Sequence, residues 1–329
     1  MKFIFLIFLI LFLLYSINYK KKEYFLNKNY KTDIIWRENW KNFDYITDNI
    51  DILNTTDNNI LFISDTYNNL HKVFKIKKNF KMIIDLPHDF CFPYDIRNNL
   101  INSDLFEKIY NMKNLKSIWS VNYNYNKDNY PNNGKINHIP LGIDFHTISK
   151  GKQKKWDKEN KNPLIQQKEL IDIYNKSKNI SERENKCFLC CPNNNSKNLK
   201  RLKYINLDRD DIKNKLKNNK NVIICNKFYT RLDFWNEIIK YKFIICPAGN
   251  GMDTHRLWEA LFLGCIVICQ ETGIDKLMAE FPVVILKDFN EITQKNLNKW
   301  SSQYEKMCVD KKVREKYYQR YWYNKILND

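Results

Sequence analysis

The sequence predicts an α/β protein with two parallel sheets, each wrapped by helices, behind an amino-terminal membrane anchor. Three observations predict it: a long apolar run at the start of the chain, short apolar and β-branched runs at intervals after it, and helical stretches between those runs. A chain of 329 residues has enough material for one large domain or two of ordinary size. We therefore expect an anchor over residues 1–22, a first domain over 23–145 and a second domain over 146–329.

The anchor is an almost unbroken apolar run from Phe3 to Ile17, followed by three lysines. Extended to Tyr19, the run would be roughly 25 Å long as a helix, which suits a thin internal membrane better than a plasma membrane. Only one small residue lies near its end, whereas a cleaved signal peptide would need several, so an uncleaved single-pass anchor in the endoplasmic reticulum or Golgi is favoured. The lysines favour a cytosolic catalytic part, and a lumenal orientation stays open.

Nine short apolar runs are predicted as strands, in two series. The runs of the second series have an apolar, β-branched character, which is typical of strands covered on both faces. Residues 231–241 and 254–263 are expected to be helices, and the lysine-rich residues 150–185 a surface excursion or hinge region. The predicted strands are residues 59–64, 81–86, 117–121 and 136–141 in the first series, and 187–191, 221–225, 242–246, 265–269 and 282–286 in the second.

The formal net charge of +18 would ordinarily indicate nucleic acid, an anionic membrane or a phosphate-bearing substrate as the partner. Lys, Asn, Ile and Tyr are abundant along the whole chain, as a nucleotide bias in the coding sequence would produce. No arginine–glycine tract or zinc-finger spacing accompanies the charge. Nucleic acid is therefore not an expected partner.

The nine cysteines do not form a recognisable metal motif. A C-x-x-C-C group at residues 187–191 has no second such group and no pair of histidines to complete a site, so a core role is favoured over a redox or metal site. Whether these thiols are paired stays open, and no metal ligand is predicted. The other cysteines within apolar runs are expected to be small core side chains, namely Cys225, Cys246, Cys265 and Cys269.

The candidate functional centre is the segment 246–268, CPAGNGMDTHRLWEALFLGCIVI, which has the pattern of a strand end, a glycine-containing loop and a helix. In open parallel sheets, ligands bind beyond the carboxyl ends of the strands, where loops lead into helices. Gly249 and Gly251, with Asn250 between them, are expected to permit positive φ and a close approach of another group to the backbone. The lysine of a P-loop and the third glycine of the dinucleotide fingerprint are absent, which argues against nucleotide hydrolysis and hydride transfer.

The helix that follows the loop is expected to hold an anion at its start. Asp253 or Thr254 is a candidate cap, and the first N–H groups of a helix favour a phosphate. Arg256 and Glu259 lie one turn apart on the same face. An arginine there can bind a diphosphate and a carboxylate can accept two hydrogen bonds from a ribose diol, which together indicate a nucleotide-sugar site. The alternative is an ion pair on a solvated helix face.

Residues 243–267, FIICPAGNGMDTHRLWEALFLGCIV, resemble the carboxyl-terminal signature of exostosin-like glycosyltransferases: an apolar strand, Pro, Gly, Asp-Ser/Thr, Arg, two residues, Glu-Ala, and Gly-Cys before a strand. The likeness extends to residues 282–290, but the usual Pro after Gly-Cys-Ile is missing, as in a divergent member. The resemblance implies two Rossmann-like domains facing a cleft (GT-B), with the nucleotide sugar as co-substrate on the second domain, the acceptor on the first, no cofactor and no obligatory metal. It implies that Arg256 meets the donor phosphate and Glu259 the ribose.

Two further segments agree with that resemblance. Residues 138–146, HIPLGIDFH, resemble the crossing between the domains of GT-B enzymes, which would place Asp144 and His146 near the reaction centre. A plain turn with a capping aspartate explains the same letters. Arg201 would lie on a helix after the first strand of the second series and clamp the diphosphate, with chance as the alternative in so lysine-rich a chain.

A base for the acceptor hydroxyl is expected at the end of the strand 81–86. An inverting transferase needs such a base, whereas a retaining one can use the departing phosphate oxygen. The candidates are Asp85, His88 and Asp89, and a surface turn is the alternative. Residues 208–210 have the Asp-x-Asp spacing of a metal-binding motif, but a helix start capped by Asp210 or Asp211 explains them better.

The sequence thus predicts a membrane-anchored glycosyltransferase that moves a sugar from a nucleoside-diphosphate sugar to a hydroxyl acceptor, with a glycan or glycoprotein as the expected partner. One alternative is glycosylation of another polymer, such as a modified nucleic-acid base. The other is a non-catalytic scaffold with a transferase-like fold.

Overall fold

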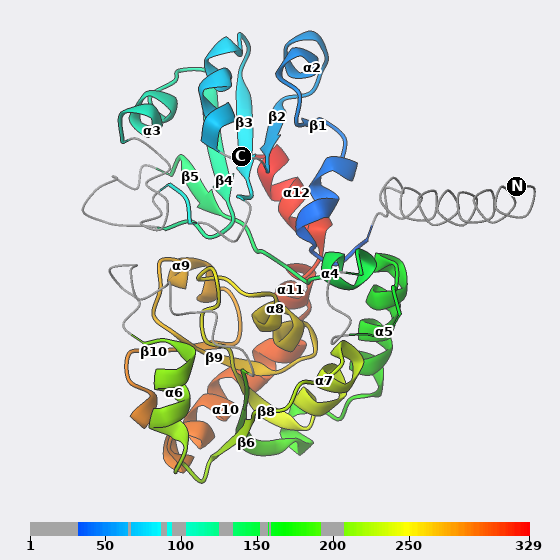
Figure 1. The fold of residues 1–329 in the computed structure, drawn as a ribbon, viewed down its shortest axis with the longest axis vertical. Coiled ribbons are helices and arrows are strands. Elements are labelled where there is room, and N and C mark those ends of the chain that lie inside the picture. Colours follow the sequence, from blue (N-terminus) through cyan, green and yellow to red (C-terminus); the bar gives the residue numbers. More distant parts are fainter. Residues whose placement is uncertain are drawn as a thin grey trace, which may run out of the picture.

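The computed structural model contains two five-stranded parallel sheets, one above the other in Figure 1, so the prediction of an α/β fold with two parallel sheets is confirmed. In the part of the chain that the structure describes, no helix is both long and apolar enough to cross a membrane. The expected anchor lies outside that part, as do His88, Asp89 and Arg201. The described residues are 32–64, 67–86, 91–93, 103–124, 134–151, 157, 159–191 and 207–329.

The first sheet has the strand order β1-β2-β3-β4-β5, so that each strand pairs with the next one along the chain. The strand β2 is apolar and buried along its whole length, and β3 is buried except at Lys81, which is partly buried. The helix α2 begins where the Asn49 side chain accepts hydrogen bonds from two backbone N–H groups. The elements of this half are η1 (Arg37–Asn42), β1 (Ile46–Thr47), α2 (Ile50–Thr55), β2 (Ile60–Ile63), η2 (Tyr67–Lys75), β3 (Phe80–Ile84), α3 (Ser103–Tyr110), β4 (Leu115–Ser120) and β5 (Ile136–His138).

The second sheet has the order β10-β9-β8-β6-β7. The chain leaves β6 toward β7 on one side, and later leaves β8 toward β9 on the other, so the strand order reverses between β6 and β8. In such sheets this reversal opens a crevice at the carboxyl ends of the strands. The strands are β6 (Glu184–Cys190), β7 (Val222–Cys225), β8 (Tyr241–Ile245), β9 (Ile266–Gln270) and β10 (Val283–Leu286).

Helices and short 3₁₀ turns connect these strands and join the two halves. The helix α8 ends at a glycine, Gly264, whose φ of +76° is the left-handed conformation that terminates many helices. The elements are α4 (His146–Ser149), α5 (Pro163–Lys176), η4 (Ile180–Glu182), α6 (Arg209–Leu216), α7 (Arg231–Ile238), α8 (His255–Phe262), α9 (Asp275–Met278), η6 (Phe289–Glu291), α10 (Gln294–Val309), α11 (Lys311–Glu315) and α12 (Gln319–Leu327).

Each of the nine predicted strands corresponds to a strand of the structure, but one strand was missed and one expectation was wrong. The strand β1 was not predicted, because its two residues are too few to show a pattern. The surface excursion or hinge expected over residues 150–185 contains the 14-residue helix α5, so that expectation is wrong for residues 163–176. The helix starts at the side chain of Asn162, with Pro163 in the first turn, and buries Leu170 in the core.

The chain connects the two halves twice. Residues 139–145 lead from β5 to α4, and α12 returns to the first half, where Figure 1 shows it beside the upper sheet. There the Tyr323 hydroxyl donates to the carbonyl of Asp44 (2.9 Å), and Lys81 donates to the carbonyl of Ile326 (2.6 Å). One apolar cluster includes buried residues of both sheets. The predicted domain boundary at residue 145 stays a prediction, but the last helix packs on the first sheet.

All nine cysteines lie in the described part of the chain, and none of them forms a disulfide. Eight are buried and Cys225 is half-buried, in agreement with a core role for most of them. The thiols of the C-x-x-C-C group are therefore unpaired.

Candidate active site between the two sheets

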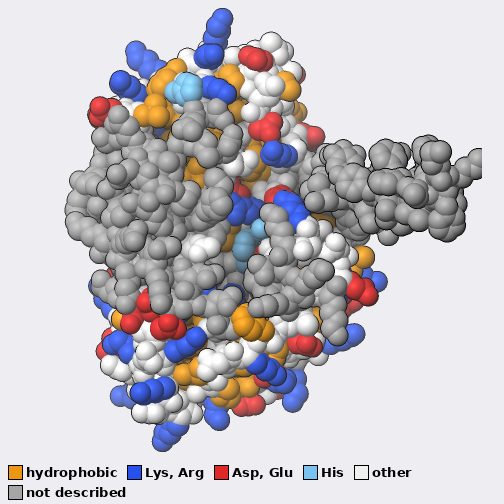
Figure 2. Space-filling model, in the orientation of Figure 1, with side chains coloured by type: hydrophobic (Ala, Val, Ile, Leu, Met, Phe, Trp, Pro, Cys, Tyr) orange, Lys and Arg blue, Asp and Glu red, His pale blue; other side chains and the backbone are white. Residues whose placement is uncertain are grey.

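A pocket lies at the carboxyl ends of the second sheet, where the strand order reverses and the crossing segment 139–145 passes over it. Figure 2 shows basic and histidine side chains gathered in a hollow at the waist between the two halves. The lining comes from the crossing segment, the end of β6, the start of α7 and the start of α8. The lining residues are Asp144, Cys190, Phe228, Tyr229, Thr230, Arg231, Phe234, His255, Arg256 and Glu259.

A buried ion pair between Asp144 and Arg231 forms the wall of this pocket. Nη2 of Arg231 lies 2.9 Å from Oδ2 of Asp144, Nη1 donates to the Asp144 carbonyl, and the N–H of Thr147 donates to Oδ1 (2.9 Å). Burial by itself would raise the pKa of Asp144, but Arg231 and His146 outweigh it and hold that pKa well below its usual value. Asp144 is therefore a fixed negative charge.

Glu259 is the second carboxylate near Arg231. Its side chain is buried on α8, and its Oε1 lies 3.5 Å from Nη1 of Arg231. Burial raises the pKa of Glu259, and the nearby Asp144 adds to that rise although Arg231 opposes it. The guanidinium of Arg231 thus interacts with two carboxylates, and its contact with Glu259 is the longer one. Such a carboxyl group has spare hydrogen-bonding capacity for a ligand.

Arg256 has a different environment from Arg231. Its Nη1 lies 3.6 Å from the thiol sulfur of Cys191, and its guanidinium carbon lies 5.1 Å from the centre of the Phe234 ring. Among the residues that the structure describes, no carboxylate is within ion-pair distance of it. A partly buried cation without an anionic partner is a site for an anionic ligand.

Arg209 is a second guanidinium at this edge of the sheet, and it was not predicted. Its Nε donates to the carbonyl of Ala248 (3.1 Å), and its Nη2 lies 2.8 Å from the point that a Cβ of Gly249 would occupy. The close approach expected at Gly249 is therefore made by Arg209. The expected positive φ is wrong, because neither Gly249 nor Gly251 is among the described glycines with positive φ. Asn250 lies exposed between them.

The expected side-chain cap of α8 is also wrong. Thr254 is the N-cap residue, but its side chain makes no capping hydrogen bond. The buried Asp253 instead accepts hydrogen bonds from the N–H of Leu141 (2.8 Å) and from Nε1 of Trp258 (2.7 Å), and its own N–H donates to the side chain of Asn122 (2.7 Å). Asp253 thus connects the glycine loop to the first half, because two of these three partners belong to it.

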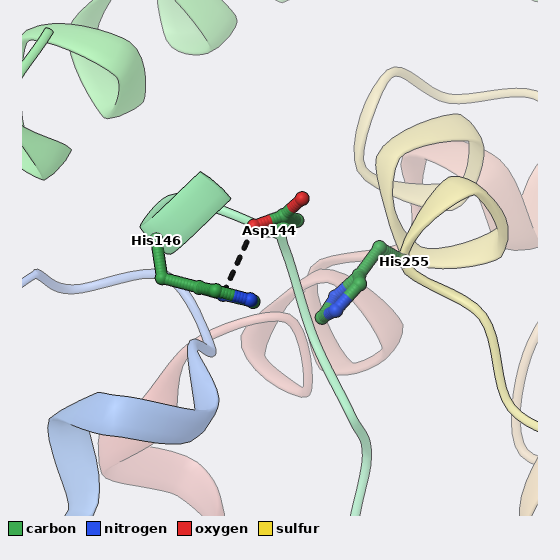
Figure 3. A group of neighbouring side chains, drawn as sticks. All are labelled: Asp144, His146 and His255. Atoms are coloured by element: carbon green, nitrogen blue, oxygen red, sulfur yellow. Dashed lines mark ion pairs between the residues drawn. The ribbon is translucent and has the colours of Figure 1, made fainter. Parts of the chain in front are cut away.

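Two histidines lie beside Asp144, as Figure 3 shows. Nδ1 of His146 is 2.9 Å from Oδ1 of Asp144. Nδ1 of His255 is 2.7 Å from the carbonyl oxygen of Gly142, and the two imidazole rings are 5.7 Å apart in an edge-to-face arrangement. His146 was expected near this place, whereas no role was predicted for His255.

The histidines and Asp144 are the one group in the described residues with potential metal-binding atoms close together, within 4.8 Å of one another. Asp144, however, already accepts hydrogen bonds from Arg231 and from the Thr147 backbone. The guanidinium also places a positive charge against the carboxylate, which opposes a second cation. The arrangement suits hydrogen bonding and proton transfer better than metal binding.

The remaining sequence candidates lie elsewhere. Asp85 is buried in an ion pair with Arg37 (2.8 and 2.6 Å) and is not among the residues that line the pocket. Its expected partners His88 and Asp89, and the diphosphate candidate Arg201, are outside the described residues. The helix start expected at the Asp-x-Asp spacing is confirmed, but the N-cap of α6 is Asp208, and Asp210 and Asp211 lie in the first turn, where Asp211 completes the capping box.

No family model matches the chain, and no curated protein does. Among solved structures, the chain is similar to the catalytic domain of starch synthase IV from Arabidopsis thaliana bound to ADP and acarbose, with 11% identity, a TM-score of 0.33, and coverage of 82% of this chain and 72% of that one. It is also similar to α,α-trehalose 6-phosphate synthase from Burkholderia multivorans, with 10% identity, a TM-score of 0.32, and coverage of 82% and 68%. At TM-scores this low, the function has to be argued from the site.

Proposed function

We propose that the chain is a glycosyltransferase of the GT-B type, which moves a sugar from a nucleoside-diphosphate sugar to a hydroxyl group of a glycan or glycoprotein. The observation that carries the proposal is the contrast between two arginines of one pocket. Arg231 is neutralised by Asp144 and Glu259, whereas no carboxylate among the described residues lies within ion-pair distance of Arg256, on which Glu259 acts only from farther away. A partly buried cation favours an anionic ligand, and a diphosphate is one.

The other walls of the pocket fit the remaining parts of such a donor. Glu259 lies one turn after Arg256, where its carboxyl group can accept hydrogen bonds from the ribose diol. Phe228, 44% exposed, and Tyr229 lie in the loop before α7 and offer flat apolar surfaces to a base. Arg209 adds a second guanidinium near the glycine loop.

The transfer step itself requires the donor site to stabilise the leaving group. As the acceptor oxygen bonds to the anomeric carbon, the bond from that carbon to the diphosphate oxygen breaks, and its electron pair leaves with the nucleoside diphosphate. Arg256 stabilises the charge that develops on this leaving group. In this proposal guanidinium groups do the work that a divalent cation does in other transferases.

The test is binding and turnover of a panel of nucleotide sugars by the wild-type chain and two arginine variants. Arg256→Ala is expected to weaken donor binding about 10- to 100-fold, because a charge-assisted hydrogen bond contributes about 1.5–3 kcal/mol. Arg320→Ala is the matched control, because it removes an exposed arginine of α12 that lies over the ring of Phe43. This variant should bind the donor as the wild type does. Equal binding by Arg256→Ala and the wild type would disprove the site. Binding without any transfer or hydrolysis would identify a scaffold.

A further inference from the structure

The imidazole of His255 is held in one tautomer by the backbone of the crossing segment. Its Nδ1 lies 2.7 Å from the carbonyl oxygen of Gly142. A carbonyl oxygen only accepts hydrogen bonds, so Nδ1 must carry the hydrogen. In the neutral ring Nε2 is then the unprotonated nitrogen, with a lone pair that can take up a proton.

The carbonyl that fixes this tautomer cannot easily move. Gly142 has a φ of +75°, and a Cβ at this position would collide with the backbone carbonyl of Ile35. The next residue, Ile143, donates its N–H to the backbone carbonyl of Ile35 (2.9 Å). The backbone of the crossing segment is thus packed directly against the segment around Ile35, and only glycine fits there.

The charges around His255 suit a base that becomes positively charged when it takes up a proton. Asp144 is a fixed negative charge within 4.8 Å of one nitrogen of each histidine, and it stabilises an imidazolium there. The charged and titratable groups that share this space are Asp144 from the crossing segment, His146 from α4, Cys190 from β6, Tyr229 from the loop before α7, Arg231 from the start of α7, and Arg256 and Glu259 from α8 itself.

We propose that His255 is the catalytic base of the transfer, an inference that rests on the proposed function. Nε2 takes the proton of the acceptor hydroxyl while the hydroxyl oxygen bonds to the anomeric carbon and the nucleoside diphosphate leaves with the electron pair of the broken bond. The imidazolium pairs with Asp144 and later releases its proton to water. Because a base in this position serves direct displacement, the product has the inverted anomeric configuration.

The test compares the wild type with His255→Asn, whose side-chain amide can still donate to the Gly142 carbonyl but cannot accept a proton. Turnover is expected to fall about 10²- to 10⁴-fold, the usual contribution of a general base, while donor affinity stays within about threefold. The wild-type rate should fall on the acid side of its pH profile, and the residual rate of the variant should not. His71→Asn, an exposed histidine of η2, is the control and should keep wild-type activity.

Two measurements on the wild-type chain keep the inference testable if the variant does not fold. Nitrogen chemical shifts of a ¹⁵N-histidine sample should show His255 with its hydrogen on Nδ1, and proton NMR of the product should show inversion. A hydrogen on Nε2, a retained configuration, or an active His255→Asn would overturn the inference while leaving the transferase intact. Loss of activity on metal chelation, restored by Zn²⁺ and abolished by His146→Ala, would also overturn it. A wild type that binds none of the nucleotide sugars would overturn the proposed function and this inference with it.

Discussion

Nη2 of Arg231 lies 2.9 Å from Oδ2 of Asp144, and both side chains are almost fully enclosed where the chain crosses from the first sheet to the second. The two residues are 87 positions apart, so this contact forms only when α7 packs against the crossing segment. It places a neutralised pair at the back of the pocket and leaves the charge of Arg256 for the ligand.

Breaking this ion pair is expected to be costly. Arg231→Met should lower the free energy of unfolding by about 3–5 kcal/mol, because it leaves the Asp144 carboxylate buried without its partner. The double variant Arg231→Met with Asp144→Leu should recover much of that loss. Urea denaturation measures both. The control Lys41→Met breaks an exposed pair with Asp48 and should cost less than about 1 kcal/mol; a similar loss in both single variants would contradict the argument.

Glu259 is expected to reduce the stability of the fold at neutral pH and to strengthen binding of the donor. The pKa of Glu259 is raised in the folded chain, so its carboxyl group keeps its proton to a higher pH there than in the unfolded chain, where its pKa is near 4.5. The contribution of Glu259 to stability is therefore highest below pH 4.5 and is lost as the pH rises through the folded pKa. Glu259→Gln should melt above the wild type at pH 7 but not at pH 4, and should bind the donor more weakly. A lower melting temperature at pH 7 would show that its contact with Arg231 dominates.

Gly142 is expected to tolerate no side chain. Gly142→Ala should lose about 2 kcal/mol or more, since it combines a strained positive φ with a collision against the Ile35 carbonyl. Gly134→Ala is the matched control, because Gly134 has a similar φ of +83° but open space around its Cβ position, and should lose only about 1–2 kcal/mol. Thermal unfolding measures both variants. Equal losses would mean that the collision is relieved at no cost.

His138 is expected to make the fold sensitive to acid. Burial lowers its pKa to about 3, and the nearby Lys276 adds to the effect. Between pH 6.5 and about 3 the unfolded chain binds a proton that the folded chain does not, so stability falls as the pH falls, by roughly 1.4 kcal/mol per pH unit. His138→Phe keeps a ring against Tyr123, whose centre lies 4.8 Å away, and should flatten the dependence. Urea denaturation at several pH values is the measurement. The same pH dependence of stability in the wild type and in His138→Phe would refute the lowered pKa of His138.

The sequence was informative where the physical signal is local. The strands of the second half were found because each is a short apolar run, and Arg256 and Glu259 because one helical turn separates them. The start of α5 carried a usable signal in Asn162 and Pro163, but the surrounding lysines obscured it.

The parts that were missed depend on contacts between distant residues. Arg231, Arg209 and His255 entered the site through partners far away in the chain, and nothing in their neighbouring residues indicates those partners. The same reason explains why Asp85 was expected to be a base, since its partner Arg37 lies 48 positions earlier. Charge compensation of this kind is decided by tertiary packing and not by local pattern.

The return of α12 to the first sheet constrains how the halves can move against each other. A closing rotation has to bend the polypeptide at two separate places at once, in residues 139–145 and just before α12. Just after α12, Asp329 also reaches the first sheet, where Nε1 of Trp119 donates to its side chain (3.2 Å). Removing residues 319–329 would therefore loosen the first half, although the residues contacted there lie 210 to 279 positions earlier in the chain.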